Sequence, residues 1–203
     1  MTFASQRFAR NTMIFAAMIW TAISVAGCGV NNIPTYEEQA KASWAEVQNN
    51  YKRRADLIPN LVDTVKGFAA QESKVLTEVI EARAKATQVT LPADILNNPE
   101  AMKKFQDAQS GLGGALGRLL AVTENYPELK SNANFLQLQQ QLEGTENRIA
   151  IARRDYILAV QQFNTEIKTI PGRWWKSLLY PQAKEMASFE ASEPDQQVPK
   201  VKF

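Results

Sequence analysis

The chain has 203 residues, with 23 Lys and Arg, 21 Asp and Glu, no His and a single Cys. The absence of His excludes Ser-His and Cys-His triads and every His-ligated zinc site. A single Cys excludes an internal disulfide framework and CxxC redox chemistry. The length suits one domain with a sizeable core, and the composition argues against an enzyme.

The first 28 residues carry an export signal. Arg7 and Arg10 precede an uncharged apolar run, and the small residues Ala26 and Gly27 follow it directly before Cys28. A basic start, an apolar run and small residues are typical of a secretory signal. A Cys directly after the small pair resembles the lipobox of bacterial lipoproteins, in which the thiol takes a diacylglyceryl group and becomes the first residue. We therefore predict a signal peptide or membrane anchor over residues 1–27 and lipidation (palmitate) at Cys28.

An uncleaved single-pass anchor is the alternative, since about 18 apolar positions, about 27 Å as a helix, just span a bilayer. Arg7 and Arg10 precede the run and no basic residue follows until Lys41, which keeps the N-terminus inside. The rest of the chain is then expected at the cell membrane, on the periplasmic side. Gly29 stands where inner-membrane lipoproteins commonly have Asp, which favours the outer membrane, although the choice between the two stays open.

The charge balance and the motifs exclude several functions. Removal of residues 1–27 takes away two Arg and no acid, so 23 − 2 = 21 basic residues face 21 acidic ones. A net charge of zero disfavours a nucleic-acid partner, because binding to phosphates needs a basic excess. The sequence has no Walker A, GxSxG or HExxH motif. We expect no catalytic residues, no metal site and no cofactor.

A first long helix is predicted from Thr35, where Thr35 and Glu38 match a capping box. Pro59 lies inside this helix and removes one backbone hydrogen bond. Because the apolar spacing continues in phase on both sides of Pro59, we predict a kink there. A break into two helices is the alternative. The spacing alternates between three and four residues along a heptad seam. The seam contains Tyr36, Ala40, Trp44, Val47, Tyr51, Arg54, Ile58, Leu61, Val65, Phe68, Glu72, Val75, Val79, Ala82 and Ala86.

Two further helices follow a Pro- and Asn-containing loop over residues 89–99. The second extends from Pro99 to Tyr126, and its four glycines indicate close helix contact or local looseness. The third extends from Glu128 to Ile170 with an apolar seam of its own. No strand pattern is present. The fold class is therefore all-α, an antiparallel up-and-down (four-)helix bundle of long helices.

The predicted organisation is a short linker over 28–34, a helical bundle over 35–190 and a disordered polar tail over 191–203. The segment Arg-Trp-Trp-Lys over residues 173–176, followed by Leu-Leu-Tyr, is amphipathic. We favour the interpretation that it caps an open end of the bundle. Contact with a bilayer surface is the alternative.

Polar residues on the first helix are the candidate interaction sites. A dense group of charges contains Lys52, Arg53 and Asp56. It indicates either a docking patch for a partner or a solvated helix face with local Arg–Asp pairs. Arg54 and Glu72 fall on the apolar seam, where a charge has to be paired. We expect an internal polar layer that fixes the register of the helices, with a small ligand pocket as the alternative. The expected partners include Glu124 and Glu146.

Several motifs together resemble the LemA family of bacterial membrane-anchored helical proteins. They are KRRADLIPNLV over 52–62, VKGFA over 65–69, LLAVTENYPELK over 119–130, NFL over 134–136 and FNT over 163–165. The match covers roughly residues 44–190. The chain departs from the family at Ile157, where Asn is common, and in carrying a lipobox where a plain transmembrane helix is usual.

The resemblance implies a long-helix bundle on a membrane anchor and no established catalytic residues. Some relatives look connected with membrane proteases or with internal membrane compartments. We therefore expect a scaffold or adaptor that meets membrane lipid through its anchor and an unidentified envelope protein through its bundle. A self-assembling protein that shapes or organises membrane is the alternative.

Overall fold

The computed structural model describes residues 13, 29–89, 92 and 94–189, and among these it contains six α-helices, one 3-10 helix and no strand. The all-α prediction is confirmed. The predicted lipidation site Cys28, the apolar run before it and the polar tail over 191–203 lie outside the described residues. Within the described part, no helix is both long and apolar enough to span a bilayer.

The first helix, α2, covers Asn32–Phe68 and continues through Pro59. It begins inside the predicted linker, and the expected capping box is wrong. The Thr35 hydroxyl instead donates to the carbonyl oxygen of Asn31 at 2.7 Å. As predicted, the seam from Ala40 to Val65 is buried throughout.

The predicted helix does not extend to Ala86, because the chain turns back at residues 69–72 and α3 covers Ser73–Gln88. The break therefore lies after Phe68 and not at Pro59. From Phe68 onward the predicted seam is only partly buried, since Val79 and Ala86 are buried, Val75 and Ala82 are half-buried and Phe68 is exposed. A heptad pattern reports which side chains are buried and does not report whether the helix is continuous.

The remaining elements are η1 (Ile95–Asn97), α4 (Pro99–Thr123), α5 (Pro127–Lys130), α6 (Ala133–Lys168) and α7 (Gly172–Leu178). Asn98 begins α4, with its side-chain oxygen accepting from the Ala101 amide at 3.0 Å. Asn132 begins α6 by accepting from the amides of Asn134 and Phe135. These caps satisfy amides that have no partner inside the helix. Asn132 also explains why the predicted third helix starts later than Glu128.

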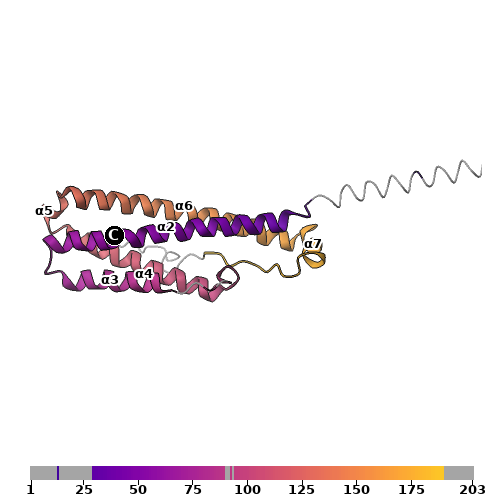
Figure 1. The fold of residues 1–203 in the computed structure, drawn as a ribbon, viewed down its shortest axis with the longest axis horizontal. Coiled ribbons are helices and arrows are strands. Elements are labelled where there is room, and N and C mark those ends of the chain that lie inside the picture. Colours follow the sequence, from indigo (N-terminus) through magenta and orange to yellow (C-terminus); the bar gives the residue numbers. More distant parts are fainter. Residues whose placement is uncertain (1–12, 14–28, 90–91, 93, 190–203) are drawn as a thin grey trace, which may run out of the picture.

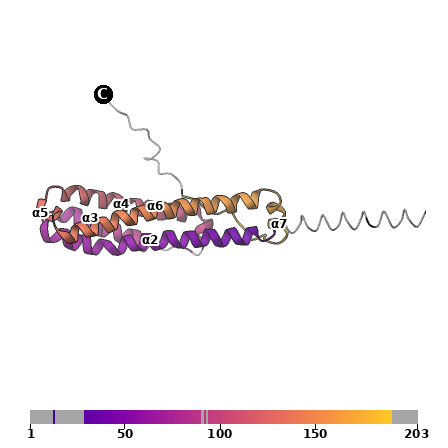
Figure 2. The same ribbon diagram turned by 90° about the horizontal axis from the view of Figure 1, so that it is seen from above.

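The helices form an elongated antiparallel bundle (Figures 1 and 2). α2 and α6 pack against each other, and α2, α3, α4 and α6 alternate in direction. α3 and α4 cover the half near α5. Along the other half the extended segment 179–189 returns from α7 (Figure 1). We call residues 180–189 the C-terminal strap.

The buried side chains form two clusters. The α7-end cluster contains aromatic rings from α2, α4, α6 and the strap: Trp44, Tyr51, Phe105, Tyr156, Phe163 and Phe189. The Trp44 ring lies 5.3 Å from Phe105 and 5.4 Å from Tyr156 between centroids. The α5-end cluster is mostly aliphatic, with side chains such as Ile58, Leu61, Val79, Leu112, Leu119 and Leu142. The protein thus has two cores along one rod.

Side chains of α6 hold the C-terminal strap through hydrogen bonds to its backbone. Asn164 donates to the carbonyl of Met186 and accepts from its amide, both at 2.9 Å. The Tyr156 hydroxyl donates to the Ala187 carbonyl at 2.7 Å. The guanidinium of Arg153 lies 4.7 Å from the centre of the Phe189 ring. The strap therefore seals the half of the core that α3 leaves uncovered.

The glycines of α4 do not mark close helix contact. A Cβ added at Gly111, Gly113 or Gly117 would meet nothing within 4 Å, and at Gly114 it would meet only the Arg118 side chain. The close-contact interpretation is therefore wrong. These glycines only lower the intrinsic helix propensity of α4.

Candidate functional site

A buried arginine lies at the boundary of the two clusters. Arg54 on α2 is 3% exposed. Its Nη1 donates to Glu146 Oε1 on α6 at 2.9 Å. Its Nη2 donates to the carbonyl and side-chain oxygens of Gln109 on α4, at 3.1 and 2.7 Å. One guanidinium therefore connects three helices.

Polar residues occupy the same level on all three helices. On α2, α4 and α6, the buried positions at this level are Arg54, Gln109 and Thr145. On each helix the seam residues before and after this level belong to different clusters, which are Tyr51 and Ile58, Phe105 and Leu112, and Leu142 and Ile149. We call Arg54, Gln109, Thr145 and Glu146 the arginine layer.

Further contacts hold the arginine layer in place. Gln109 Nε2 donates to the Ala86 carbonyl at the end of α3 at 3.3 Å. The Arg54 guanidinium lies 5.0 Å from the centre of the Tyr51 ring, which suits a cation–π contact. Burial raises the pKa of the Tyr51 hydroxyl, and the positive charges of Arg153 and Arg54 partly offset that rise. The arginine layer thus contacts all four long helices, α2, α3, α4 and α6.

Most of the polar groups of the arginine layer bond to one another or to the neighbouring backbone. The Arg54 guanidinium is buried, Glu146 matches its charge and Gln109 accepts from its Nη2, whereas its Nε has no hydrogen-bond partner among the described residues. Buried ion pairs contribute little net stability but penalise alternative packings that leave a charge unpaired. Shifting α2 along α6 would separate Arg54 from Glu146.

Glu72 and Glu124 do not belong to this layer, contrary to expectation. Glu72 follows the turn between α2 and α3 and accepts from the Tyr126 hydroxyl at 2.8 Å. That hydrogen bond raises the pKa of Tyr126. Glu124 is exposed and pairs with Lys130. Both acids lie at turns near the α5 end, whereas Arg54 lies about four helical turns before the end of α2.

Lys52, Arg53 and Asp56 lie on the exposed face of α2. Within the described part of the chain, none of the three forms an ion pair, so the expected local Arg–Asp pairs are absent. Their charged groups face solvent and are free to contact another molecule.

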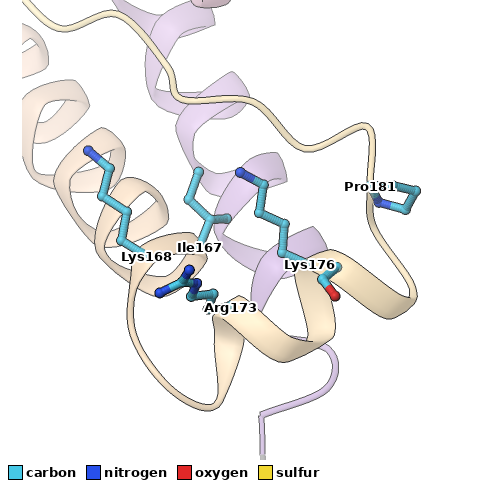
Figure 3. A pocket seen from close by; sticks show the side chains of 6 residues that line it. Ile167, Lys168, Arg173, Lys176 and Pro181 are labelled. Atoms are coloured by element: carbon cyan, nitrogen blue, oxygen red, sulfur yellow. The ribbon is translucent and has the colours of Figure 1, made fainter.

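The α7 end combines basic and apolar side chains. A hollow of about 530 Å³ is lined by Ile167, Lys168, Arg173, Lys176, Ser177 and Pro181 (Figure 3). Trp175 packs against the α7-end cluster, whereas Trp174 is 57% exposed. The segment therefore caps the bundle with one aromatic ring and presents the other outward.

Among the described residues, no three His, Cys, Asp or Glu side chains are grouped to hold a metal ion. A smaller hollow of about 260 Å³ near α5 is lined by Leu120, Thr123, Glu124, Lys130, Phe135, Leu136 and Gln139. Its carboxylate, Glu124, is paired with Lys130, and its Thr123 hydroxyl donates to the Leu120 carbonyl at 2.6 Å.

Sequence reasoning missed Gln109 and Asn164. Gln109 stood as a polar residue on the seam of its helix, which was a usable signal. Asn164 gave no such signal, because its partner is the backbone of an extended segment.

These features define a helical-bundle protein with a buried arginine that bonds to two neighbouring helices. The family model of the LemA family matches residues 43–203. The chain belongs to the LemA family, as its motifs predicted.

Three relatives are similar to this protein over most of the chain. Magnetosome protein MamQ 2 of Paramagnetospirillum magneticum is 27% identical over 180 residues, which cover 81% of this chain and 65% of the relative. Magnetosome protein MamQ of Magnetospirillum gryphiswaldense is 26% identical over 70% of this chain and 58% of the relative. Protein LemA of Metamycoplasma hominis is 24% identical over a match that covers 80% of this chain and 69% of the relative. The match thus spans about 65% or less of the length of the MamQ relatives.

Proposed function

We propose that this protein is a membrane-anchored, non-catalytic scaffold or adaptor on the periplasmic side of a membrane. The observation that carries the proposal is the position of α2. It begins at Asn32, just after Cys28, and its 37 residues are about 55 Å long as one helix. A lipid on Cys28 would hold one end of the bundle at the membrane and present the α5 end well away from it.

Family membership supports membrane association. The scaffold role is favoured by the chemistry of the described residues, since both terminal nitrogens of the buried Arg54 guanidinium already bond to Glu146 and Gln109. Lys52 and Arg53 are exposed about halfway along α2 and pair with no acid in the part of the chain that the structure describes, so an envelope protein carrying acidic groups has access to them.

In-cell photo-crosslinking tests the adaptor role. A photoreactive residue at Lys52, Arg53 or Lys130, followed by mass spectrometry, is expected to capture one abundant envelope protein. Lys103 is a matched control, because it is exposed on α4 and weakly paired with Asp107 at 3.9 Å. Crosslinks at Lys52 that are no more selective than those at Lys103 would overturn the adaptor role.

The anchor is tested separately with Cys28→Ala. We expect this variant to accumulate as unprocessed precursor without lipid, because the thiol is the acceptor of the diacylglyceryl group. Mass spectrometry of the N-terminal peptide measures the outcome. A variant whose mature N-terminus still begins at residue 28 rules out the lipobox.

Self-assembly that organises a membrane is the second candidate. Ile151, Ile157 and Leu158 are exposed on the outer face of α6, and relatives carry the name magnetosome protein. Oligomers that grow with concentration on vesicles, and that Ile151→Gln with Leu158→Gln abolishes, are expected in this case. Crosslinks from Lys52 to copies of this chain alone would favour it over the adaptor.

A further inference from the structure

The outward face of α7 and its flanking turns is unusually apolar for a surface. Ile170, Trp174, Leu178 and Leu179 are each more than half exposed, and all lie within ten residues. Clustered exposed apolar side chains indicate an interaction site, whereas scattered ones do not. Among the described residues of the half near α5, the large exposed apolar side chains are Phe68, Leu136 and Ile80, which lie apart and are each less exposed than those four.

The same segment is basic. Residues 168–184 contain Lys168, Arg173, Lys176 and Lys184 and no acidic residue. Lys168 pairs with Glu185 at 2.8 Å, and the nearby Glu166 accepts from the Asn32 side chain at 3.3 Å. Among the described residues Arg173 and Lys176 form no ion pair, so their charges are not neutralised by the protein. Both line the hollow drawn in Figure 3.

The position of α7 relative to the N-terminal segment identifies the occupant. α7 contacts α2 at the end where α2 begins (Figures 1 and 2). The 28 residues that precede the continuous structure contain the apolar run and Cys28. A membrane reached through that segment is therefore close to the α7 end and distant from the α5 end.

We propose that the α7 face rests on the surface of the same bilayer, with Trp174, Leu178 and Leu179 at the headgroup level and Arg173 and Lys176 on anionic phosphates. Trp prefers this interface because its ring is apolar and its N–H is polar. Basic side chains beside apolar ones are the combination that holds a segment in the interfacial plane. The inference rests on the proposed anchor and adds a second contact, which would fix how the rod stands on the membrane.

The full chain reconstituted in vesicles tests the contact. The vesicles contain phosphatidylcholine, phosphatidylglycerol as the anionic lipid, and a phospholipid with a diazirine in its acyl chain. After illumination, mass spectrometry is expected to locate lipid adducts on residues 170–179 and none near Phe68 or Leu136. Equal adducts at the two ends of the rod, or none on α7, would overturn the proposal.

Two double variants separate charge from apolar contact. Arg173→Gln with Lys176→Gln should lower the adduct yield about tenfold or more, since each basic side chain near an anionic surface adds about fivefold to association. Trp174→Gln with Leu178→Gln should lower it in pure phosphatidylcholine as well. Phe68→Gln with Leu136→Gln is the control and should change nothing. Circular dichroism verifies that the variants fold, which we expect because the substituted side chains lie at the surface. Unchanged yields in both α7 variants would overturn the proposal.

Vesicle flotation keeps this inference distinct from the anchor. A chain that floats without α7 adducts contradicts the α7 contact and leaves the anchor standing. A chain that floats only with phosphatidylglycerol, and not after Arg173→Gln with Lys176→Gln, supports α7 and contradicts the anchor. A wild-type chain that does not float contradicts both.

Discussion

Arg54 and Glu146 are 92 residues apart in the chain and form an ion pair of 2.9 Å between α2 and α6. The arginine is buried, whereas the glutamate side chain is 48% exposed. The pair therefore joins the two long helices α2 and α6, and the guanidinium bears most of its desolvation cost because the carboxylate is still reached by water.

Glu146→Gln should lower the free energy of unfolding by about 2 kcal/mol, less than for a fully buried pair because water reaches this edge. The buried guanidinium loses its counter-charge while Gln109 stays bonded. Glu143→Gln, exposed on the same helix, is the control and should have little effect. Urea unfolding followed by circular dichroism measures both. Equal stability of the two variants would show that the charge of Glu146 contributes nothing.

Arg54→Met together with Gln109→Leu should leave the stability unchanged or raise it by about 1–4 kcal/mol, because an apolar layer avoids desolvation of the guanidinium. Arg54→Met alone should be less stable than the double variant, since Gln109 then loses a partner inside the core. The same urea titration measures both. A strong loss of helicity in the double variant would contradict a role limited to alignment.

Tyr156→Phe should lower the free energy of unfolding by about 1–2 kcal/mol at neutral pH, because the Ala187 carbonyl loses its donor. Burial raises the pKa of Tyr156 far above its ordinary value of 10.0. Above pH 10 the unfolded chain therefore loses this proton while the folded chain keeps it, so wild-type stability falls as pH rises.

The phenylalanine variant should show a shallower loss of stability between neutral pH and pH 11, measured by urea unfolding at several pH values. Tyr36→Phe is the control, because its hydroxyl makes no hydrogen bond among the described residues. An identical alkaline slope in Tyr156→Phe and wild type would contradict the assignment.

Asn164→Ala should release the C-terminal strap and cost about 2 kcal/mol, the sum of two hydrogen bonds. Hydrogen–deuterium exchange is expected to rise over residues 183–189 while α3 stays protected, because the strap seals only the α7-end cluster. Asn147→Ala, exposed on the same helix, is the matched control. Faster exchange throughout the bundle would show that the strap is part of one cooperative unit.

Gly172→Ala and Gly117→Ala should have opposite effects. A Cβ at Gly172 would collide with the Glu166 carbonyl oxygen, so the turn into α7 has to move, which costs about 1–3 kcal/mol of stability. A Cβ at Gly117 meets open space, and the better helix propensity should add about 1 kcal/mol. Thermal unfolding measures both shifts. Destabilisation by Gly117→Ala would reveal a contact absent from this structure.

The sequence by itself determined the fold class, the family and the buried faces of α2, α4 and α6, because heptad spacing reports burial directly. It also marked Arg54 as a charge inside a core, since that residue interrupts an apolar seam.

Only the tertiary structure decided which residues meet. The chain reverses at residues 69–72, and this placed Glu72 beside Tyr126 and left Glu146 and Gln109 for Arg54. The strap was likewise invisible to periodicity, because an extended segment bonded through its backbone has no repeating pattern. Burial is a property of each helix's own spacing, whereas pairing depends on turns whose position the spacing does not encode.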